Sequence, residues 1–487
     1  MSASYYWYDL ETSGLNPRWD RVVQFAGLRT DMDLQPVEAP QSFYVQLPDD
    51  VLPNPDATLV TGITPELTHA EGIPEWQALA QVEKIFAQPA TCVAGYNSLR
   101  FDDEFVRYGF YRMLRDPYAR EWQNGNSRWD IIDLVRATGA LRPEGIAWPT
   151  DADGLPVYKL ELLTQANGLE HGNAHDALSD VYATVAMARL IKQSQPKLFE
   201  YYFNLRHKKA IRQLLEPMGA KVCVHVSGMY PRSQFGTAPV VSVCRHPRNS
   251  NAIVVADLSQ DVESLISWPA ERIREALFSR GAGASRPPLK EIRVNRCPFV
   301  ADLAVLTEEN WSRLGFDAKL IKERQRRLAA PGIARKLLQV FGAQSHEPAP
   351  DVEAALYEGF LHDEDKRRCA TFASELDAGR WQDLDYADKR LSDLAQRLKA
   401  RSFGHLLSPA EQQEWHEFVS QKLQQPDAPW LSLAAFHARL DTLLSEADEL
   451  EAGADKARRL ELLLALKRHG ENLVKRYGLA GGVPGSP

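Results

Sequence analysis

The stretch that decides the fold is YYWY at residues 5–8, followed directly by DLETSG at residues 9–14. The aromatic run predicts a buried β-strand, and because residues i and i+2 of a strand face the same side, Asp9 and Glu11 would present two carboxylates together. Two such anions repel each other and lose hydration when buried, and a bound cation relieves both costs. The motif therefore favours a metal site at a strand end, although Asp-x-Glu taken alone is more often a solvated acidic turn.

The composition is that of a soluble globular protein, since 44% of the 487 residues are hydrophobic and 25% are charged. A chain of this length exceeds what one hydrophobic core usually serves, so about two to four domains are expected. We see neither a signal-peptide pattern nor the roughly 18 apolar residues of a membrane span, which predicts a cytoplasmic protein. The five cysteines are scattered without CxxC spacing, which argues against a disulfide framework and a zinc site.

Basic residues are concentrated in two clusters, although the net charge is −8. In the first, residues 319–336, Glu323 is the single acid, and the bases include Lys322, Arg324, Arg326 and Arg327. The second consists of Arg206, His207, Lys208, Lys209 and Arg212. Either cluster alone is compatible with a solvated helix face. Beside a metal–carboxylate site, contact with nucleic-acid phosphates becomes the favoured interpretation.

The first 200 residues alternate between predicted strands and helices. Further strands are predicted at residues 21–30, 42–47 and 91–94 from their aromatic and β-branched content. Helices are predicted from Pro65, with Thr64 as N-cap, then at residues 76–86, from 99 to 113, from 128, at 160–166 and from 176 to 191. This order indicates an α/β or α+β domain.

The residue pattern of the sequence changes twice after that domain. Short β-rich runs at residues 221–230, 239–246, 251–259 and 291–303, separated by Gly, Pro, Asn and Ser, predict a small barrel or sandwich. From about residue 351 the pattern is almost entirely helical, with 3.6-residue periodicity in residues 391–398 and 440–466. Composition and periodicity therefore place domain boundaries near residues 200 and 350.

Four carboxylates on separate predicted elements are candidates for one site: Asp9, Glu11, Asp102 and Asp180. Hard oxygen ligands of this number suit two divalent metal ions that hold a water and a phosphate oxygen. His175 precedes a helix capped by Asp176 and could take a proton from that water, since its pKa lies near neutral pH. Each residue also has a simpler interpretation, as a helix cap or as a favourable charge at a helix N-terminus.

The blocks DLETSG, NSLRFDDE (residues 97–104) and HDALSD (residues 175–180) resemble, in order and spacing, the DEDDh 3′→5′ exonucleases, which have an RNase H-like fold. Segments such as ALRPEGIAWP (residues 140–149), VHVSGM and NRCP are similar to bacterial exonuclease I, a family of single-strand-specific deoxyribonucleases. The resemblance implies an α/β RNase H-like exonuclease domain at residues 1–197. An SH3-like β-barrel domain for DNA binding at 198–348 and an all-α C-terminal domain at 349–487 would follow it.

The resemblance also implies roles for the candidate residues. Asp9, Glu11, Asp102 and Asp180 would bind two Mg²⁺ ions, for which Mn²⁺ may substitute, and His175 would be the general base. Asp103 stays open as a second candidate for the third ligand. The implied activity is 3′→5′ hydrolysis of single-stranded DNA to 5′-mononucleotides in DNA repair and recombination. Two alternatives are an RNA 3′ exonuclease, since the motif does not register the 2′-hydroxyl, and an inactive single-strand-binding scaffold.

The resemblance also implies a site for a protein partner, and the basic clusters predict a path for the DNA. The family binds the acidic, Phe-ending tail of single-stranded DNA-binding protein, and its contact positions match Arg142, Tyr201 and Lys221 here. Others differ, because Asp302 and Thr307 replace polar and basic residues of the family. The bases Lys322, Arg324, Arg326 and Arg327 are the expected DNA contacts. The expected state is a monomer without a membrane partner.

Overall fold

The first domain is built on a mixed five-stranded sheet in this computed structural model, which describes residues 3–169, 177–278, 286–343 and 347–479. Its strands, in the order β3-β2-β1-β4-β5, are β1 (Ser4–Thr12), β2 (Val22–Thr30), β3 (Gln41–Tyr44), β4 (Thr91–Gly95) and β5 (Ser127–Asp130). The pairs β1–β2 and β2–β3 are antiparallel, whereas β1–β4 and β4–β5 are parallel. The predicted strands at residues 5–11, 21–30, 42–47 and 91–94 are confirmed to within a few residues.

Strand β1 is buried on both faces, which explains its unbroken aromatic run. Tyr5 and Trp7 point into one hydrophobic core, with α5 (Ile132–Leu141), α7 (Ala177–Ser194) and α8 (Pro196–Asn204). Tyr6 and Tyr8 point into a second core on the opposite face, with α3 (Glu75–Phe86) and α4 (Asp102–Arg112). The period of two along a strand therefore divides the run between two helical layers.

The remaining helices of this domain are α1 (Pro55–Thr61), α2 (Pro65–Glu71) and α6 (Leu160–Ala166), with a 3₁₀ turn at Ser98–Arg100 ahead of α4. Thr64 caps α2 as predicted, because its hydroxyl accepts a hydrogen bond from the Leu67 N–H at 3.2 Å. The helix predicted from residue 128 is wrong at its start. Residues 127–130 form β5, and α5 begins only at Ile132, because pairing of β5 with β4 outweighs the local helical pattern.

The second domain contains an antiparallel sheet in the order β10-β6-β7-β8-β9. The strands are β6 (Val222–Val226), β7 (Thr237–Arg245), β8 (Ala252–Asp257), β9 (Leu289–Arg293) and β10 (Phe299–Asp302). The helices are α9 (Lys208–Leu215), α10 (Glu263–Ser267), α11 (Ala270–Phe278), α12 (Glu308–Leu314), α13 (Ala318–Leu328) and α14 (Ile333–Gly342). Phe299 of β10 shares a core with Trp129 of β5, so apolar packing joins the two sheets.

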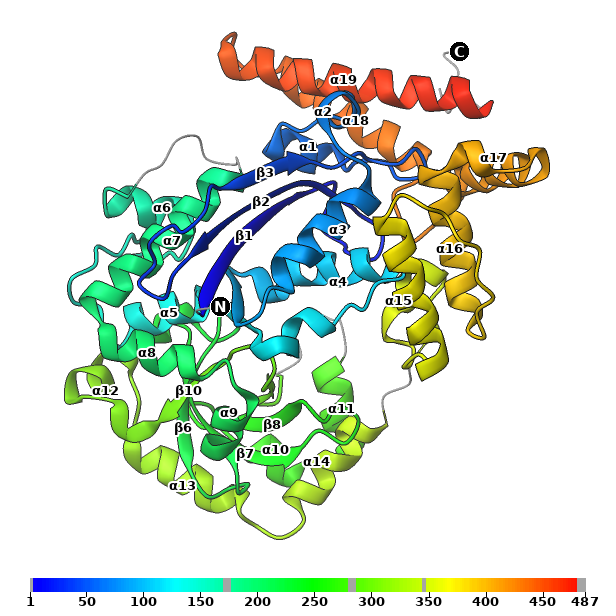
Figure 1. Cartoon of the computed structure of the whole chain (residues 1–487). Coiled ribbons are helices and arrows are strands. Elements are labelled where there is room, and N and C mark those ends of the chain that lie inside the picture. The colour runs from blue at the N-terminus through cyan, green and yellow to red at the C-terminus, as the bar shows by residue number, and fades with distance from the viewer. Residues whose placement is uncertain (1–2, 170–176, 279–285, 344–346, 480–487) are drawn as a thin grey trace, which may run out of the picture.

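The C-terminal region is helical, as predicted, and contacts the first domain at two places (Figure 1). It comprises a 3₁₀ turn at Val352–Tyr357, then α15 (Asp363–Asp377), α16 (Lys389–Ser402), α17 (Pro409–Gln424), α18 (Leu433–Asp448) and α19 (Ala454–Tyr477). Phe372 and Leu391 extend the core around α4, and α18 and α19 contact α1. Among the described residues, no helix has the length and apolarity needed to cross a membrane.

Candidate active site

Three carboxylates converge where β1 ends. Asp9 and Glu11 lie on the same side of β1, and Asp180 lies in the first turn of α7, which packs against β1. One carboxylate oxygen from each of the three lies within 4.8 Å of the others, and all three side chains are partly buried. A donor set of hard, anionic oxygens at this spacing fits a divalent metal ion.

Asp102 belongs to the same electrostatic environment. The pKa of Asp9 is raised well above its ordinary value by burial and then by the charges of Asp102, Asp180 and Glu11. Burial likewise raises the pKa of Asp102, although the Leu10 N–H of β1 hydrogen-bonds to it. Burial and mutual repulsion make ionisation of these carboxylates costly in free energy, and a bound cation would remove that cost.

Asp103 is adjacent in sequence but has a different environment. It forms ion pairs with the guanidinium groups of Arg120 and Arg128, and the Tyr8 hydroxyl lies 3.4 Å from its Oδ1. Burial alone would raise the pKa of Asp103, yet Arg120 and Arg128 outweigh burial and hold this pKa below its ordinary value. Its charge is therefore already compensated, which leaves Asp102 as the acid available to a metal ion.

Asp130 supports Asp102 from the end of β5, and sequence analysis missed it. Its carboxylate accepts hydrogen bonds from the backbone N–H groups of Asn97 at 2.8 Å and Leu99 at 3.1 Å. These bonds fix the 3₁₀ turn that leads into Asp102, and burial raises the pKa of Asp130 to about 6. The Asp that ends the strand SRWD (residues 127–130) was the available signal, and the mistaken helix start concealed it.

The turn after Glu11 is closed by its own hydrogen bonds. Ser13 and Arg21 bond reciprocally: the Ser13 N–H donates to the Arg21 carbonyl at 2.8 Å, and the Arg21 N–H donates to the Ser13 hydroxyl at 2.9 Å. A Cβ on Gly14 would lie 2.4 Å from Asp20 Oδ2, so a larger residue here would require the Asp20 carboxylate to move. The predicted general base, His175, and the predicted cap Asp176 lie outside the described residues.

The three predicted partner residues lie near β10. The Arg142 guanidinium donates to Val305 O at 2.9 Å and to Asn310 Oδ1 at 3.1 Å. The Tyr201 hydroxyl donates to Val300 O at 2.8 Å, and Lys221 is exposed at the start of β6, which pairs with β10. Arg142 thus connects the first domain to the second, and Tyr201 holds α8 against β10. Burial raises the pKa of Tyr201, and the nearby Asp302 adds to this effect.

The helix α13, which carries the first basic cluster, lies on the side of the second domain that is away from β1 (Figure 1). Lys322 and Arg326 are exposed. Arg324 donates to Leu258 O at 2.9 Å, and Arg327 pairs with Glu263 of α10. Two of the four predicted DNA contacts, Arg324 and Arg327, therefore bond to residues of their own domain.

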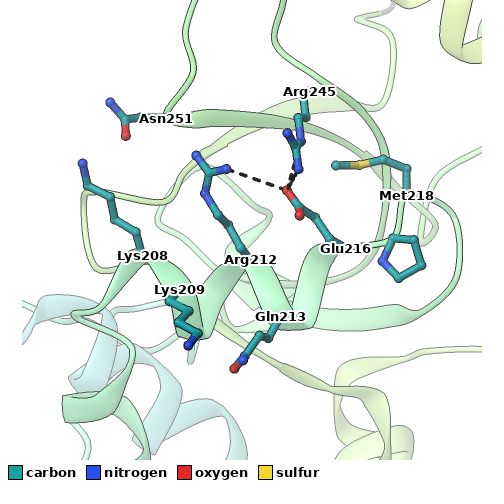
Figure 2. A pocket seen from close by; sticks show the side chains of 9 residues that line it. Lys208, Lys209, Arg212, Gln213, Glu216, Met218, Arg245 and Asn251 are labelled. Carbon is teal, nitrogen blue, oxygen red and sulfur yellow. Dashed lines mark hydrogen bonds and ion pairs between the residues drawn. The ribbon is translucent and has the colours of Figure 1, made fainter.

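Three residues of the second basic cluster, Lys208, Lys209 and Arg212, line an open pocket of about 1000 Å³ along α9 (Figure 2). Arg245 and Arg212 both approach Glu216, at 2.9 and 4.0 Å, whereas no acidic side chain in the described part of the chain forms an ion pair with Lys208 or Lys209. These two lysines also line a neighbouring cavity of about 450 Å³, together with Arg128, Arg206, Asn295 and Trp122. Trp122 is 66% exposed. The two cavities share Lys208 and Lys209, and the smaller one lies between the first two domains; together we call them the basic cleft.

The basic cleft reaches the sheet of the first domain at the N-terminal end of β5, whereas the carboxylates lie towards the C-terminal end of the central strand β1. Ser127, which lines the smaller cavity, is in register with Cys92 of β4, and Cys92 with Tyr5 of β1. Asp9 lies four residues beyond Tyr5, about 13 Å along the strand. The cleft is therefore a surface separate from the metal ligands.

Comparison with known proteins follows the same division of the chain. An exonuclease family model matches residues 6–188, a model of the exonuclease I SH3-like domain matches residues 206–343, and one of the exonuclease I C-terminal domain matches residues 350–473. With the RNase H-like sheet and its carboxylate cluster, these matches define the class: the chain is an exonuclease, a metal-dependent nuclease with an SH3-like and a helical domain attached.

Similarity to individual proteins extends over nearly the whole chain. Exodeoxyribonuclease I of Haemophilus influenzae is 41% identical over 97% of this chain and 99% of its own length, and that of Escherichia coli is 39% identical over the same shares. The structure of exonuclease I from Methylocaldum szegediense, at 39% identity, superposes with a TM-score of 0.90 over 97% of this chain and 100% of that one. The chain therefore belongs to the exodeoxyribonuclease I family.

Proposed function

We propose that this protein hydrolyses single-stranded DNA from the 3′ end and releases 5′-mononucleotides, acting in DNA repair and recombination as a monomer. The observation that carries the proposal is the convergence of Asp9, Glu11 and Asp180 beside the buried Asp102. The E. coli relative, whose structure with a dA16 oligonucleotide has a TM-score of 0.90 at 38% identity, supports DNA as the substrate. We place the domain boundaries at 197/198 and 348/349.

Asp9, Glu11, Asp102 and Asp180 would hold two Mg²⁺ ions, and the existence of a zinc-bound form of the E. coli exonuclease I–DNA complex is consistent with a metal at this site. When bound, the ions supply activation of the attacking water and stabilisation of charge on the phosphate and the departing 3′-oxygen. His175 would accept the proton of that water. Asp103, paired with two arginines, would keep α4 in place rather than bind metal.

The path of the DNA outside the active site follows from the distribution of cations. We place the strand in the basic cleft, where Lys208 and Lys209 are exposed and Trp122 offers a surface for base stacking. Lys322 and Arg326 of α13 would contact DNA further along. The tail of single-stranded DNA-binding protein would bind near Arg142, Tyr201 and Lys221, with Asp302 weakening the attraction of an acidic peptide.

The decisive experiment compares labelled single-stranded DNA, double-stranded DNA and RNA of one sequence, with and without Mg²⁺. Metal-dependent release of mononucleotides from the 3′ end of single-stranded DNA alone is expected. Preference for RNA would establish the alternative RNA exonuclease, and binding without hydrolysis would establish a scaffold. His175→Ala should lose roughly 10²- to 10⁴-fold in rate and regain part of it at higher pH, where hydroxide replaces the base.

The partner site has its own measurement. Calorimetric titration of a tail peptide should show Arg142→Ala binding more weakly by about 1.5–3 kcal/mol, the scale of a charge-assisted hydrogen bond. Hydrolysis of naked DNA should stay near normal. Equal affinities for the variant and the wild type would remove this site from the proposal.

A further inference from the structure

A buried ion pair connects the C-terminal region to the turn that follows Glu11. Glu353 lies in the 3₁₀ turn Val352–Tyr357, and its Oε2 accepts a hydrogen bond from Arg21 Nη2 at 2.5 Å. The two side chains are 1% and 0% exposed. They are separated by 332 positions in the sequence, so only the docked C-terminal region brings them together.

Arg21 also bonds directly to the DLETSG motif. Its backbone N–H and carbonyl form the two reciprocal hydrogen bonds with Ser13, at 2.9 and 2.8 Å. Its Nη1 also donates to Trp19 O at 2.8 Å, which holds the far side of the same turn. Ser13 is two residues from Glu11, so the position of Arg21 bears directly on where the Glu11 carboxylate lies.

Glu353 itself is held from the other side by Arg401 of α16, whose Nη2 lies 2.5 Å from Glu353 Oε1. Arg401 also donates to Asp50 at 2.6 Å, and Lys422 of α17 donates to the same carboxylate at 2.6 Å. Burial of such charges rarely increases net stability compared with apolar packing, whereas it does fix geometry and register in well-studied systems. A network of this kind therefore suits positioning better than stabilisation.

We propose that Glu353 is a positioning residue for the metal centre: by holding Arg21, the C-terminal region fixes the turn that carries Glu11 and so sets the affinity for metal. The inference rests on the proposed metal-dependent hydrolysis. It gives the helical C-terminal region a part in catalysis besides any contact with DNA.

The test is Glu353→Gln, which keeps the size of the side chain and removes its charge. The Mg²⁺ concentration for half-maximal hydrolysis should rise roughly five- to tenfold, the scale of coupling within one ion-pair network, while KM for DNA stays unchanged. Calorimetric titration with Mn²⁺ alone, in the absence of DNA, should show the same weakening. The calorimetric result does not depend on hydrolysis, so it tests the inference even if the proposed activity fails.

Glu411→Gln is the matched control. Glu411 of α17 makes an ion pair with Lys399 of α16 at 3.0 Å, so the same substitution removes a charge from the C-terminal region without changing the partners of Glu353 or Arg21. Its metal dependence should equal that of the wild type. A double variant, Arg21→Gln with Glu353→Gln, should bind metal no more weakly than Arg21→Gln alone, because the two residues act in series.

Glu353→Asp, which retains the charge, provides a second route if Glu353→Gln does not fold, and it should weaken Mn²⁺ binding by a smaller factor. An unchanged Mn²⁺ affinity in a folded variant, accompanied only by a lower melting temperature, would overturn the proposal. In that case the ion pair would be structural alone.

Discussion

Two groups of buried carboxylates in this molecule have opposite electrostatic environments. At the end of β1, Asp9 is surrounded by Asp102, Asp180 and Glu11, and after burial these charges raise its pKa. At the junction with the C-terminal region, burial would also raise the pKa of Asp50, but Arg401 and Lys422 hold it below its ordinary value. Burial alone therefore does not define a metal site. The close approach of several acids to one another, as at the end of β1, distinguishes the candidate site.

The largest effect should come from breaking the carboxylate group at the end of β1. Asp180→Asn and Asp9→Asn each remove a proposed metal ligand and should lower the rate of hydrolysis by on the order of 10³-fold or more, since metal ions contribute several kcal/mol to charge stabilisation in the transition state. Binding of DNA, measured by fluorescence anisotropy, should largely survive. If both variants keep more than about a hundredth of the wild-type rate, the two-metal assignment fails.

Breaking the compensated group should change stability instead. Asp50→Ala leaves Arg401 and Lys422 buried without their shared partner, and the free energy of unfolding should fall by about 3–5 kcal/mol, measured by urea denaturation at pH 7. Because the pKa of Asp50 is lowered in the folded protein, its contribution is present above the ordinary value of 3.8 and is lost as the pH falls below that value. A variant as stable as the wild type at pH 7 would show that Asp50 does not compensate these two cations.

The two groups of carboxylates should also change the stability of the folded protein in opposite directions as the pH rises. A carboxyl with a raised pKa binds its proton more tightly in the folded chain, so metal-free protein loses stability as the pH rises from the ordinary value of 3.8 towards the raised one. Asp9→Asn removes this penalty. Without metal, the variant should become more stable than the wild type by up to about 1.4 kcal/mol per pH unit in that interval, measured by denaturation with a chelator present. Saturating Mg²⁺ should abolish or reverse the difference.

The smallest expected effect is on DNA binding, and it comes from replacing exposed lysines of the basic cleft. Arg120 and Arg128 are occupied by Asp103, whereas Lys208 and Lys209 in the basic cleft are exposed. Replacing both lysines by Ala should weaken binding of single-stranded DNA and flatten its salt dependence, by about 0.7 in logarithmic slope for each phosphate that the protein no longer neutralises.

A charge-matched control is available on α19, where Lys467 and Lys475 are also exposed. Replacing that pair by Ala should leave the slope unchanged. The quadruple change of Lys322, Arg324, Arg326 and Arg327 to Ala tests α13 in the same assay. An unchanged slope for α13 would assign that helix to the solvated surface, and an unchanged slope for Lys208 and Lys209 would remove the cleft from the DNA path.

The sequence by itself determined the elements whose signals are local. The aromatic run predicted β1, the period of two placed Asp9 and Glu11 on one side, and Thr64 with Pro65 marked the start of α2. The change from mixed to β-rich to helical patterns predicted three regions of different structure. These features depend on neighbouring residues in the chain, so backbone geometry and periodicity are enough to infer them.

Only the tertiary structure decided which acids are compensated. Asp102 and Asp103 are adjacent residues of the same type, so the sequence does not distinguish their roles. Their electrostatic environments differ because Arg120 and Arg128, from a later segment, form ion pairs with Asp103. The strand β5, mistaken for a helix start, takes its conformation from pairing with β4. Glu353 and Arg21 lie in different domains, and their contact depends on how those domains dock. Electrostatic energy depends on distance in space, which periodicity along the chain does not encode.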